Sequence, residues 1–154
     1  MSTDEKTLQE YVGRCRAEFY TKPFDQVAFP RGVKFNYGET KNRSAGRYNL
    51  DSKSLPIQVR AALLYNKIIK EKELTNLQQI GSDDKIKFVY LRTPNPIGDN
   101  IIGAPTMLPK ELGLDDYIDY QTQFNKSFLE PIQSVLSTIG WQAEKISTLE
   151  SFFQ

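Results

Sequence analysis

The sequence contains no histidine and a single cysteine among its 154 residues, and each absence excludes a class of chemistry. With one cysteine, neither an intrachain disulfide nor a cysteine-rich zinc site can form. Without an imidazole, the usual serine and cysteine triads lose their base, and histidine-based metal centres are excluded. Any catalysis by this chain would therefore have to use carboxylates, lysine or tyrosine.

Long apolar segments and targeting signals are also missing. No run of about 18 apolar residues occurs, and the start of the chain, MSTDEKTLQEY, lacks a basic region followed by an apolar one. Neither the G-x-x-x-x-G-K-[ST] nor the G-x-G-x-x-G phosphate-binding motif is present. We therefore expect a soluble, cytoplasmic protein, and nothing indicates a nucleotide-binding enzyme.

The composition is that of a folded globular chain, with 39% hydrophobic and 25% charged residues, and the length predicts one domain. The net charge of +1 conceals an asymmetry: residues 1–80 hold 14 Lys and Arg against 9 Asp and Glu, whereas residues 81–154 hold 6 against 10. A basic half and an acidic half suggest different partners.

Basic residues are concentrated between positions 31 and 60, where only Glu39 and Asp51 oppose them. A nucleic-acid backbone is bound by several Lys or Arg side chains on one solvent-facing segment. We predict that this basic stretch contacts phosphates, although a solvated charged loop is the alternative. The candidate residues are Arg31, Lys34, Lys41, Arg43, Arg47, Lys53 and Arg60.

Periodicity predicts an α+β fold, mainly helical, with a small β-hairpin and a long basic loop. We expect helices over about 4–20 and 54–72, an irregular connection around Pro23 and Pro30, a loop over 31–54, and strands at 85–92 and 100–103. Gly81 to Asp84 should be a turn. The residues between the strands, TPNPIGD, should form a tight, rigid connection.

The segment from Leu108 to Trp141 is helical in character. Pro131 should kink the helix or begin a new one, and Gly140 should end it. One buried side is predicted to carry Ile118, Phe124, Phe128, Ile132, Val135 and Ile139.

Two clusters have both a functional and a structural interpretation. Asp115, Asp116 and Asp119 could form a carboxylate site for metal or acid–base work, but acidic residues in a first helical turn more often cap amide groups, which we favour. The C-terminal apolar residues could pack on this domain or bind in a partner's pocket, and composition alone favours packing. They are Leu149, Phe152 and Phe153.

Several motifs together resemble the C-terminal part of the family B replicative DNA polymerases of large tailed phages. They occur in the family's order and at similar spacing from about residue 8 to the end. The motifs are Pro56-Ile-Gln-Val-Arg60, Asn95-Pro96-x-Gly98-Asp99, Leu108-Pro-Lys-Glu111, Ile118-Asp119 and Phe124-x-Lys126-Ser127-Phe128-x-x-Pro131.

The resemblance implies a thumb domain over residues 1–145 that holds primer–template duplex by its backbone. It also implies a tail, residues 146–154, that docks on the sliding clamp through Leu149, Phe152 and Phe153. The family's palm, fingers and exonuclease motifs are absent, so the chain should be inactive alone and carry no cofactor, with magnesium bound in the missing palm. Expected partners are duplex DNA, the remaining polymerase portion and the clamp, in the cytoplasm of the host cell.

A free-standing accessory protein that binds DNA or the clamp is the alternative function. An independent carboxylate enzyme is the least favoured. The favoured hypothesis, which the resemblance implies, is that the chain is one part of a split or truncated DNA-directed DNA polymerase.

Overall fold

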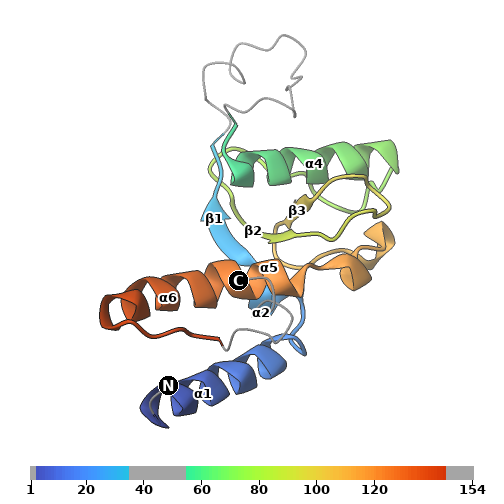
Figure 1. Ribbon diagram of the computed structural model, residues 1–154. Coiled ribbons are helices and arrows are strands. Elements are labelled where there is room, and N and C mark those ends of the chain that lie inside the picture. The colour runs from blue at the N-terminus through green and yellow to red at the C-terminus, as the bar shows by residue number, and fades with distance from the viewer. Residues whose placement is uncertain (1–2, 35–54, 145–154) are drawn as a thin grey trace. The chain divides into compact units, whose positions relative to one another are not determined.

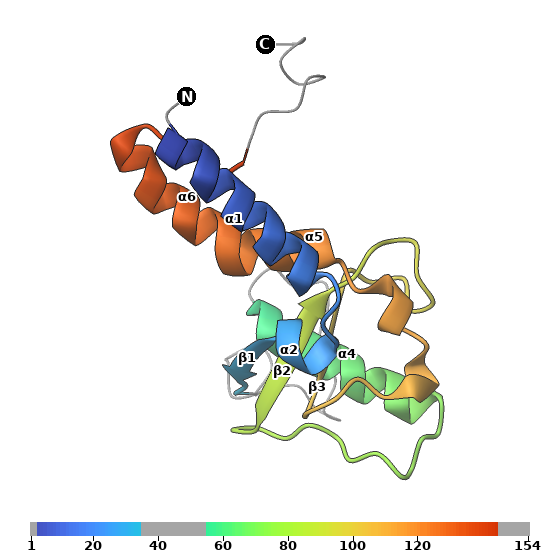
Figure 2. The ribbon, with the colours of Figure 1, turned by 90° about the horizontal axis from the view of Figure 1, so that it is seen from below.

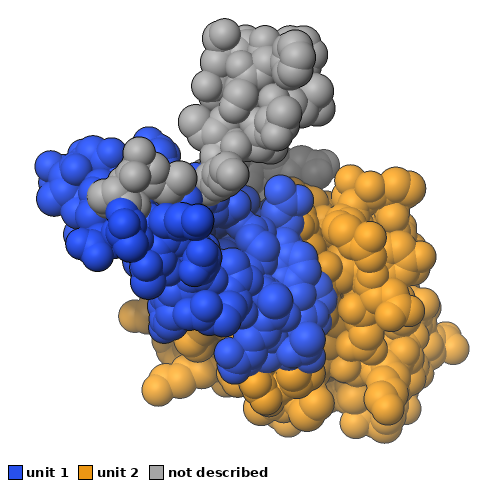
Figure 3. Space-filling model, turned by 60° about the horizontal axis from the view of Figure 1, so that its bottom comes forward, with its two compact units in different colours: residues 1–22, 120–154 blue, residues 23–119 orange. Residues whose placement is uncertain are grey.

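The computed structural model describes residues 3–34 and 55–144, and the chain divides into two compact units. Unit 1 consists of residues 1–22 and 120–154, and unit 2 of residues 23–119 (Figure 3). Length alone predicted one domain and does not reveal this division. Both ends of the chain belong to unit 1, because residues 120–144 return to lie against the first helix (Figure 2).

Unit 1 is built from two helical segments that lie side by side (Figures 1 and 2). The first is helix α1, Thr3–Phe19, which confirms the predicted helix over 4–20. Asp4 and Glu5 occupy its first turn, where acidic side chains favour the positive end of the helix dipole. The second segment is helical throughout and contains α5 (Tyr120–Phe124), η4 (Asn125–Leu129), α6 (Glu130–Leu136) and η5 (Ser137–Ile139).

Of the two predicted interruptions in this second segment, the stop at Gly140 is confirmed. Pro131 lies in the first turn of α6, directly after η4, and Leu129 and Glu130 before it are also helical, so the segment changes its helix type beside Pro131 without a break. Gly140 adopts a left-handed conformation with φ of 75° directly after η5, which ends the helix.

The predicted buried stripe is wrong at its C-terminal end. Val135 and Ile139 are 69% and 60% exposed, and Leu136 is buried instead. The reason is η4, a π-helical turn, which places one residue more in a turn than an α-helix does. Every face after Leu129 is therefore displaced by one residue from the α-helical period that the sequence pattern assumed.

Aromatic side chains join the two segments of unit 1. Phe124 is 1% exposed, and its ring centroid lies 5.3 Å from that of Phe19 on α1 and 5.0 Å from that of Phe128. The guanidinium of Arg16 lies 4.8 Å from the centroid of the Phe124 ring, a cation–π geometry. Tyr120 donates its hydroxyl hydrogen bond to the carbonyl oxygen of Lys22 at 2.6 Å, which fixes the end of α1 to the start of α5.

Unit 2 contains a three-stranded antiparallel sheet in the order β1-β2-β3. The strands are β1 (Phe29–Gly32), β2 (Lys85–Tyr90) and β3 (Ile101–Ala104), and a short helix α2 (Phe24–Val27) precedes β1. The predicted hairpin of the last two strands and the turn at Gly81–Asp84 are confirmed. The expected irregular connection around Pro30 is in part the strand β1. Proline is tolerated there because β1 is an edge strand, where a residue without a backbone N–H need not donate a hydrogen bond to a neighbouring strand.

Helix α4 (Ile57–Glu71) packs against the sheet and confirms the predicted helix, including its buried stripe of Ala61, Leu64 and Ile68. The approach is close at Gly103 of β3. A β-carbon there would lie 3.0 Å from Ile86 Cδ1 and 3.3 Å from Ala61 Cβ. A glycine in the strand thus allows the helix to contact the sheet directly.

Residues 108–119 do not form the continuous helix that the sequence suggested. Two short 3₁₀ turns, η2 (Lys110–Leu112) and η3 (Asp115–Tyr117), are separated by Gly113, whose φ of 64° ends the first turn. Ile118 then forms a bridge to Leu91, and the Asp119 amide donates to the Tyr90 carbonyl at 2.9 Å. These strand-like contacts lie at the C-terminal end of β2, and the next helix, α5, begins at Tyr120.

The fold class is therefore α+β, as predicted, with about half of the described residues helical and a small antiparallel sheet. In the described part of the chain, every helix is too short or too polar to cross a membrane.

Candidate nucleic-acid interface

The structure holds the beginning of the basic stretch firmly on unit 2. Arg31 lies in the edge strand β1, and both Arg31 and Lys34 are exposed. The Arg31 guanidinium lies 5.6 Å from the ring centroid of Phe29, and its Nη1 donates to the Pro30 carbonyl at 2.6 Å. The Phe29 ring in turn lies 5.4 Å from that of Phe88. Arg31 is thus held on an aromatic surface while its charge remains in solvent.

The pairing of β1 continues as far as Val33. Its amide donates to the Asp84 carbonyl at 3.0 Å, and the Asp83 amide donates to the Val33 carbonyl at 2.7 Å. Val33 is fully buried, so the chain is fixed up to the residue before Lys34. The described beginning of the basic stretch is therefore fixed to the sheet as far as Val33.

A further cation at this end of the sheet was missed by the sequence reasoning. Lys85 is exposed and lies opposite Gly32 in the register of β1 and β2. Lys85 follows Gly32 by 53 residues in the sequence, so the sequence pattern could not predict that the two lie together. Only the pairing of β1 with β2 brings them close. Asp83 and Asp84 lie in the turn beside Lys85, and the Asp84 carboxylate accepts a hydrogen bond from the Gly81 amide at 2.7 Å.

Arg60 has an internal partner. Its Nη2 forms an ion pair with Asp99 Oδ1, and its Nη1 donates to Asn100 Oδ1 at 3.3 Å. The two charged side chains are 26% and 31% exposed. Arg60 therefore connects the first turn of α4 with the residues that precede β3, and its charge is largely compensated. The phosphate contact predicted for Arg60 from sequence is untested by these contacts, and the ion pair favours a structural role instead.

The connection between β2 and β3 is as tight as predicted, and Asn95 is the residue that organises it. Its Nδ2 donates to the carbonyls of Arg92 at 2.8 Å and Asp99 at 2.7 Å. Its Oδ1 accepts from the amides of Ile97 and Gly98, both at 3.0 Å. Asparagine supplies two donors and an acceptor in one side chain, so this single residue bonds two carbonyls and two amides of the connection. Asp99 is positioned for Arg60 as a result.

Most of the remaining site residues lie outside the described ranges. These are Lys41, Arg43, Arg47 and Lys53 of the basic stretch and Leu149, Phe152 and Phe153 of the tail. The boundary predicted at residue 146 lies there too.

The residues that lead to the tail are described, and they are held by unit 1. Gln133 Oε1 accepts from the Ala143 amide at 2.8 Å, and Gln133 Nε2 donates to the Trp141 carbonyl at 3.0 Å. Gln142 is bonded on both sides to α1: its amide donates to Glu5 Oε2 at 2.9 Å, and its carbonyl accepts from Gln9 at 3.0 Å. Residues 141–144 thus form a strap across unit 1, and sequence reasoning missed the Gln133 amide that holds it.

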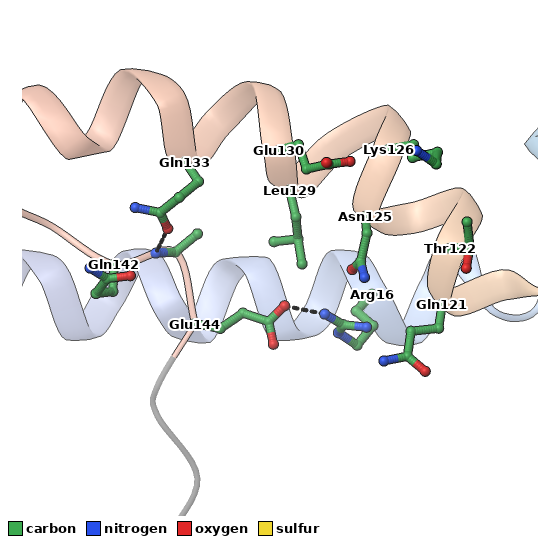
Figure 4. A pocket seen from close by; sticks show the side chains of 11 residues that line it. Arg16, Gln121, Thr122, Asn125, Lys126, Leu129, Glu130, Gln133, Gln142 and Glu144 are labelled. Atoms are coloured by element: carbon green, nitrogen blue, oxygen red, sulfur yellow. Dashed lines mark hydrogen bonds and ion pairs between the residues drawn. The ribbon is translucent and has the colours of Figure 1, made fainter. Parts of the chain in front are cut away.

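A groove of about 540 Å³ lies along this strap (Figure 4). Arg16 on its floor forms an ion pair with Glu144 at the end of the strap. Asn125 also lines the groove, and its Oδ1 is buried without a hydrogen-bond partner. The lining contains neither a paired nucleophile and base nor a concentration of one charge. It is made of Arg16, Gln121, Thr122, Asn125, Lys126, Leu129, Glu130, Gln133, Gln142, Ala143 and Glu144.

The acidic cluster forms no metal site in the described chain. Across residues 3–34 and 55–144, no three carboxylate or thiol residues converge on a point where an ion could be held. Asp115 and Asp116 begin the 3₁₀ turn η3 and are exposed, and Asp119 lies outside any helix. They do not share the helix face that the carboxylate hypothesis required.

Two tyrosines have perturbed acidity. Burial raises the pKa of Tyr65 on α4 above its usual value of 10.0, and the nearby Glu111 carboxylate raises this pKa further. A hydrogen bond with Cys15 raises the pKa of Tyr11 on the exposed face of α1. The Tyr65 shift thus arises mainly from burial, and the Tyr11 shift mainly from a hydrogen bond at the surface of α1.

Comparison with known proteins confirms a resemblance to phage DNA-directed DNA polymerases. The chain is 31% identical over 153 residues, 97% of its length, to the DNA-directed DNA polymerase of Enterobacteria phage T4. It is 29% identical over 102 residues, 64% of its length, to the DNA-directed DNA polymerase of Escherichia phage RB69. These matches cover 16% and 11% of the two polymerases, so the chain spans a small portion of each relative. No family model matches the chain.

Proposed function

We propose that this chain is the thumb portion of a phage DNA-directed DNA polymerase, and that it holds primer–template duplex by its backbone. The observation that carries the proposal is the similarity itself, which spans 97% of this chain but only 16% of the phage T4 polymerase. A chain so similar to one part of a replicative enzyme is most simply the same part of such an enzyme.

Phosphate contacts are proposed for the basic stretch, beginning at Arg31 and Lys34 on the edge of the sheet. Both side chains are exposed. The aromatic support of Arg31 suits a backbone contact, because the guanidinium keeps its fork of donors while its orientation is restricted. Lys41, Arg43, Arg47 and Lys53 continue the same positive segment in sequence.

The chain is proposed to be inactive alone. Phosphoryl transfer requires carboxylates that hold the metal ions aligned with the reacting phosphates, and the family's motifs for them are absent from this sequence. Magnesium would be bound by the palm of the remaining polymerase portion. The tail, with Leu149, Phe152 and Phe153, is proposed to tether the assembled polymerase to the sliding clamp.

Binding of the purified chain to a fluorescent duplex, measured across a range of salt concentrations, tests the duplex-holding function. Each phosphate contact adds about one unit to the slope of log affinity against log salt. Arg43→Ala should reduce this slope by about one unit, and similar reductions are expected for Lys41→Ala and Arg47→Ala. Lys6→Ala, which removes one exposed positive charge from α1, is the matched control and should leave the slope unchanged. Binding that is indifferent to salt, or strongly sequence-specific, would contradict the proposal.

Primer extension separates the polymerase part from the alternative, a free-standing accessory protein. The chain with magnesium and a primed template should add no nucleotide, and a polymerase portion that lacks this region should regain processive synthesis when the chain is added. Duplex binding without any such restoration would favour the accessory protein. Synthesis that copurifies with this chain alone at constant specific activity would refute both.

A further inference from the structure

Unit 1 exposes an apolar stripe on its outer surface. We call Ile132, Val135 and Ile139 the outer stripe, since they occupy successive turns of α6 and η5. Val135 is 69% exposed and Ile139 60%, while Ile132 is half-buried. Large aliphatic side chains grouped on one face and exposed to this extent are typical of an interaction surface.

The π turn fixes this orientation. Leu129 and Gln133 point into the groove toward α1 in Figure 4, and Leu136 is buried on the same segment. Gln133 is held there by hydrogen bonds to the strap at residues 141 and 143. Rotating the segment to bury Val135 and Ile139 would withdraw Gln133 from the strap and expose Leu136. The outer stripe therefore cannot turn inward without loss of these contacts.

The position of the outer stripe indicates its partner. Ile139 is followed within three residues by Gln142, which is bonded to Glu5 and Gln9 in the first three turns of α1. The helical segment that carries the outer stripe thus ends near the N-terminal end of α1, as Figures 1 and 2 also show. In the phage T4 polymerase, 84% of the polypeptide lies outside the region that this chain matches, since the match covers 16%. The ordered motifs resemble the C-terminal part of such polymerases, so under the proposed function that polypeptide precedes the matched region and joins it at this end of α1.

We propose that the outer stripe docks on the polymerase polypeptide that precedes the matched region. The contact is a buried aliphatic one, with Val135 and Ile139 as its anchors. This inference rests on the proposed function and adds to it the surface through which this portion joins the remainder of the enzyme.

The strap makes the chain's own tail a less suitable occupant. It passes from Gln142, beside Gln9, to Glu144, beside Arg16, which is about 10 Å further along α1 at 1.5 Å per residue. At Glu144 the chain is therefore leading away from the end of α1 where the outer stripe lies.

The test measures binding of this chain to a phage T4 polymerase that is truncated to lack the matched region. This chain carries a fluorescent label, and fluorescence anisotropy reports its binding. The parent chain should bind, and the double variant Val135→Asp/Ile139→Asp should bind at least tenfold more weakly. Met107→Asp is the matched control, since Met107 is a large apolar residue that is 62% exposed in unit 2, and it should bind as the parent does. Circular dichroism should show parental melting for both variants, because the replaced side chains are exposed. If the aspartates impair folding, the double variant Val135→Ala/Ile139→Ala replaces the aspartate variant in the test.

Failure to bind by the parent, or equal binding by the parent and the double variant, would overturn the inference. A chain ending at residue 144 should bind as tightly as the full chain, and a gain in its affinity would identify the tail as the occupant instead. Duplex binding by the same variants is measured in parallel. Loss of docking with intact duplex binding refutes only this inference, whereas loss of duplex binding by the parent refutes the proposed function.

Discussion

Replacing Arg60 by alanine distinguishes a fold-stabilising residue from a phosphate contact. Arg60 lies in the first turns of α4 and pairs with Asp99, with a further hydrogen bond of 3.3 Å to Asn100. Asp99 is itself positioned by Asn95, which donates to its carbonyl at 2.7 Å. The substitution therefore breaks a cross-link between the helix and the loop that leads into β3, and it leaves the Asp99 carboxylate without its cation.

The expected cost follows from the exposure of the pair. Fully exposed ion pairs contribute about 0.2–1 kcal/mol, and hydrogen bonds to charged groups contribute about 1.5–3 kcal/mol. With side chains 26% and 31% exposed, the pair lies between these classes, so Arg60→Ala should lower the free energy of unfolding by about 1–2 kcal/mol. Urea denaturation measures this loss. A double-mutant cycle with Asp99→Ala should give a coupling energy of about 1 kcal/mol.

For duplex binding, in contrast to stability, Arg60→Ala is expected to have no effect. Because Asp99 compensates the charge of Arg60, Arg60→Ala should leave the salt slope of duplex affinity unchanged, whereas Arg31→Ala should lower it by about one unit. A drop of one unit for Arg60→Ala, with no loss of stability, would refute this reasoning. It would instead support the phosphate contact that the sequence suggested.

Three further predictions concern packing, pH and the tail. Gly103→Ala should destabilise unit 2 by about 1–3 kcal/mol, because its β-carbon would approach Ile86 and Ala61. Gly13→Ala, on the open face of α1, should instead stabilise the protein by up to about 1 kcal/mol. Urea denaturation of the two variants checks the signs. The raised pKa of Tyr65 predicts stability that is fully present below pH 10 and declines above it as the unfolded chain ionises first, so the denaturation midpoint of Tyr65→Phe should fall less steeply there than that of the parent. Phe152→Ala or Phe153→Ala should cost about 2 kcal/mol of clamp affinity and leave thermal stability unchanged, whereas core residues would lose about 3–5 kcal/mol of stability. Lost stability together with no clamp binding by the parent would end the docking hypothesis.

The sequence by itself determined most of the local elements and the resemblance to phage DNA polymerases. The stripe of Ala61, Leu64 and Ile68 specified α4 because residues three and four apart share a helix face. Pro131 and Gly140 marked the start and the end of α6 with η5, since one lacks a donor and the other tolerates a positive φ. The ordered motifs identified the resemblance without any structure, and the comparisons confirmed it.

Tertiary structure decided what depends on contacts distant in sequence or on a single added residue. The π turn at Asn125–Leu129 displaced the face of α6 by one position, so Leu136 is buried and Val135 and Ile139 are exposed. A periodic pattern cannot reveal such a shift, because it assumes a constant number of residues per turn. Arg60 looked like its basic neighbours until Asp99, 39 residues later, was found beside it. Charge can be counted along a sequence, but its compensation depends on which side chains the fold brings together.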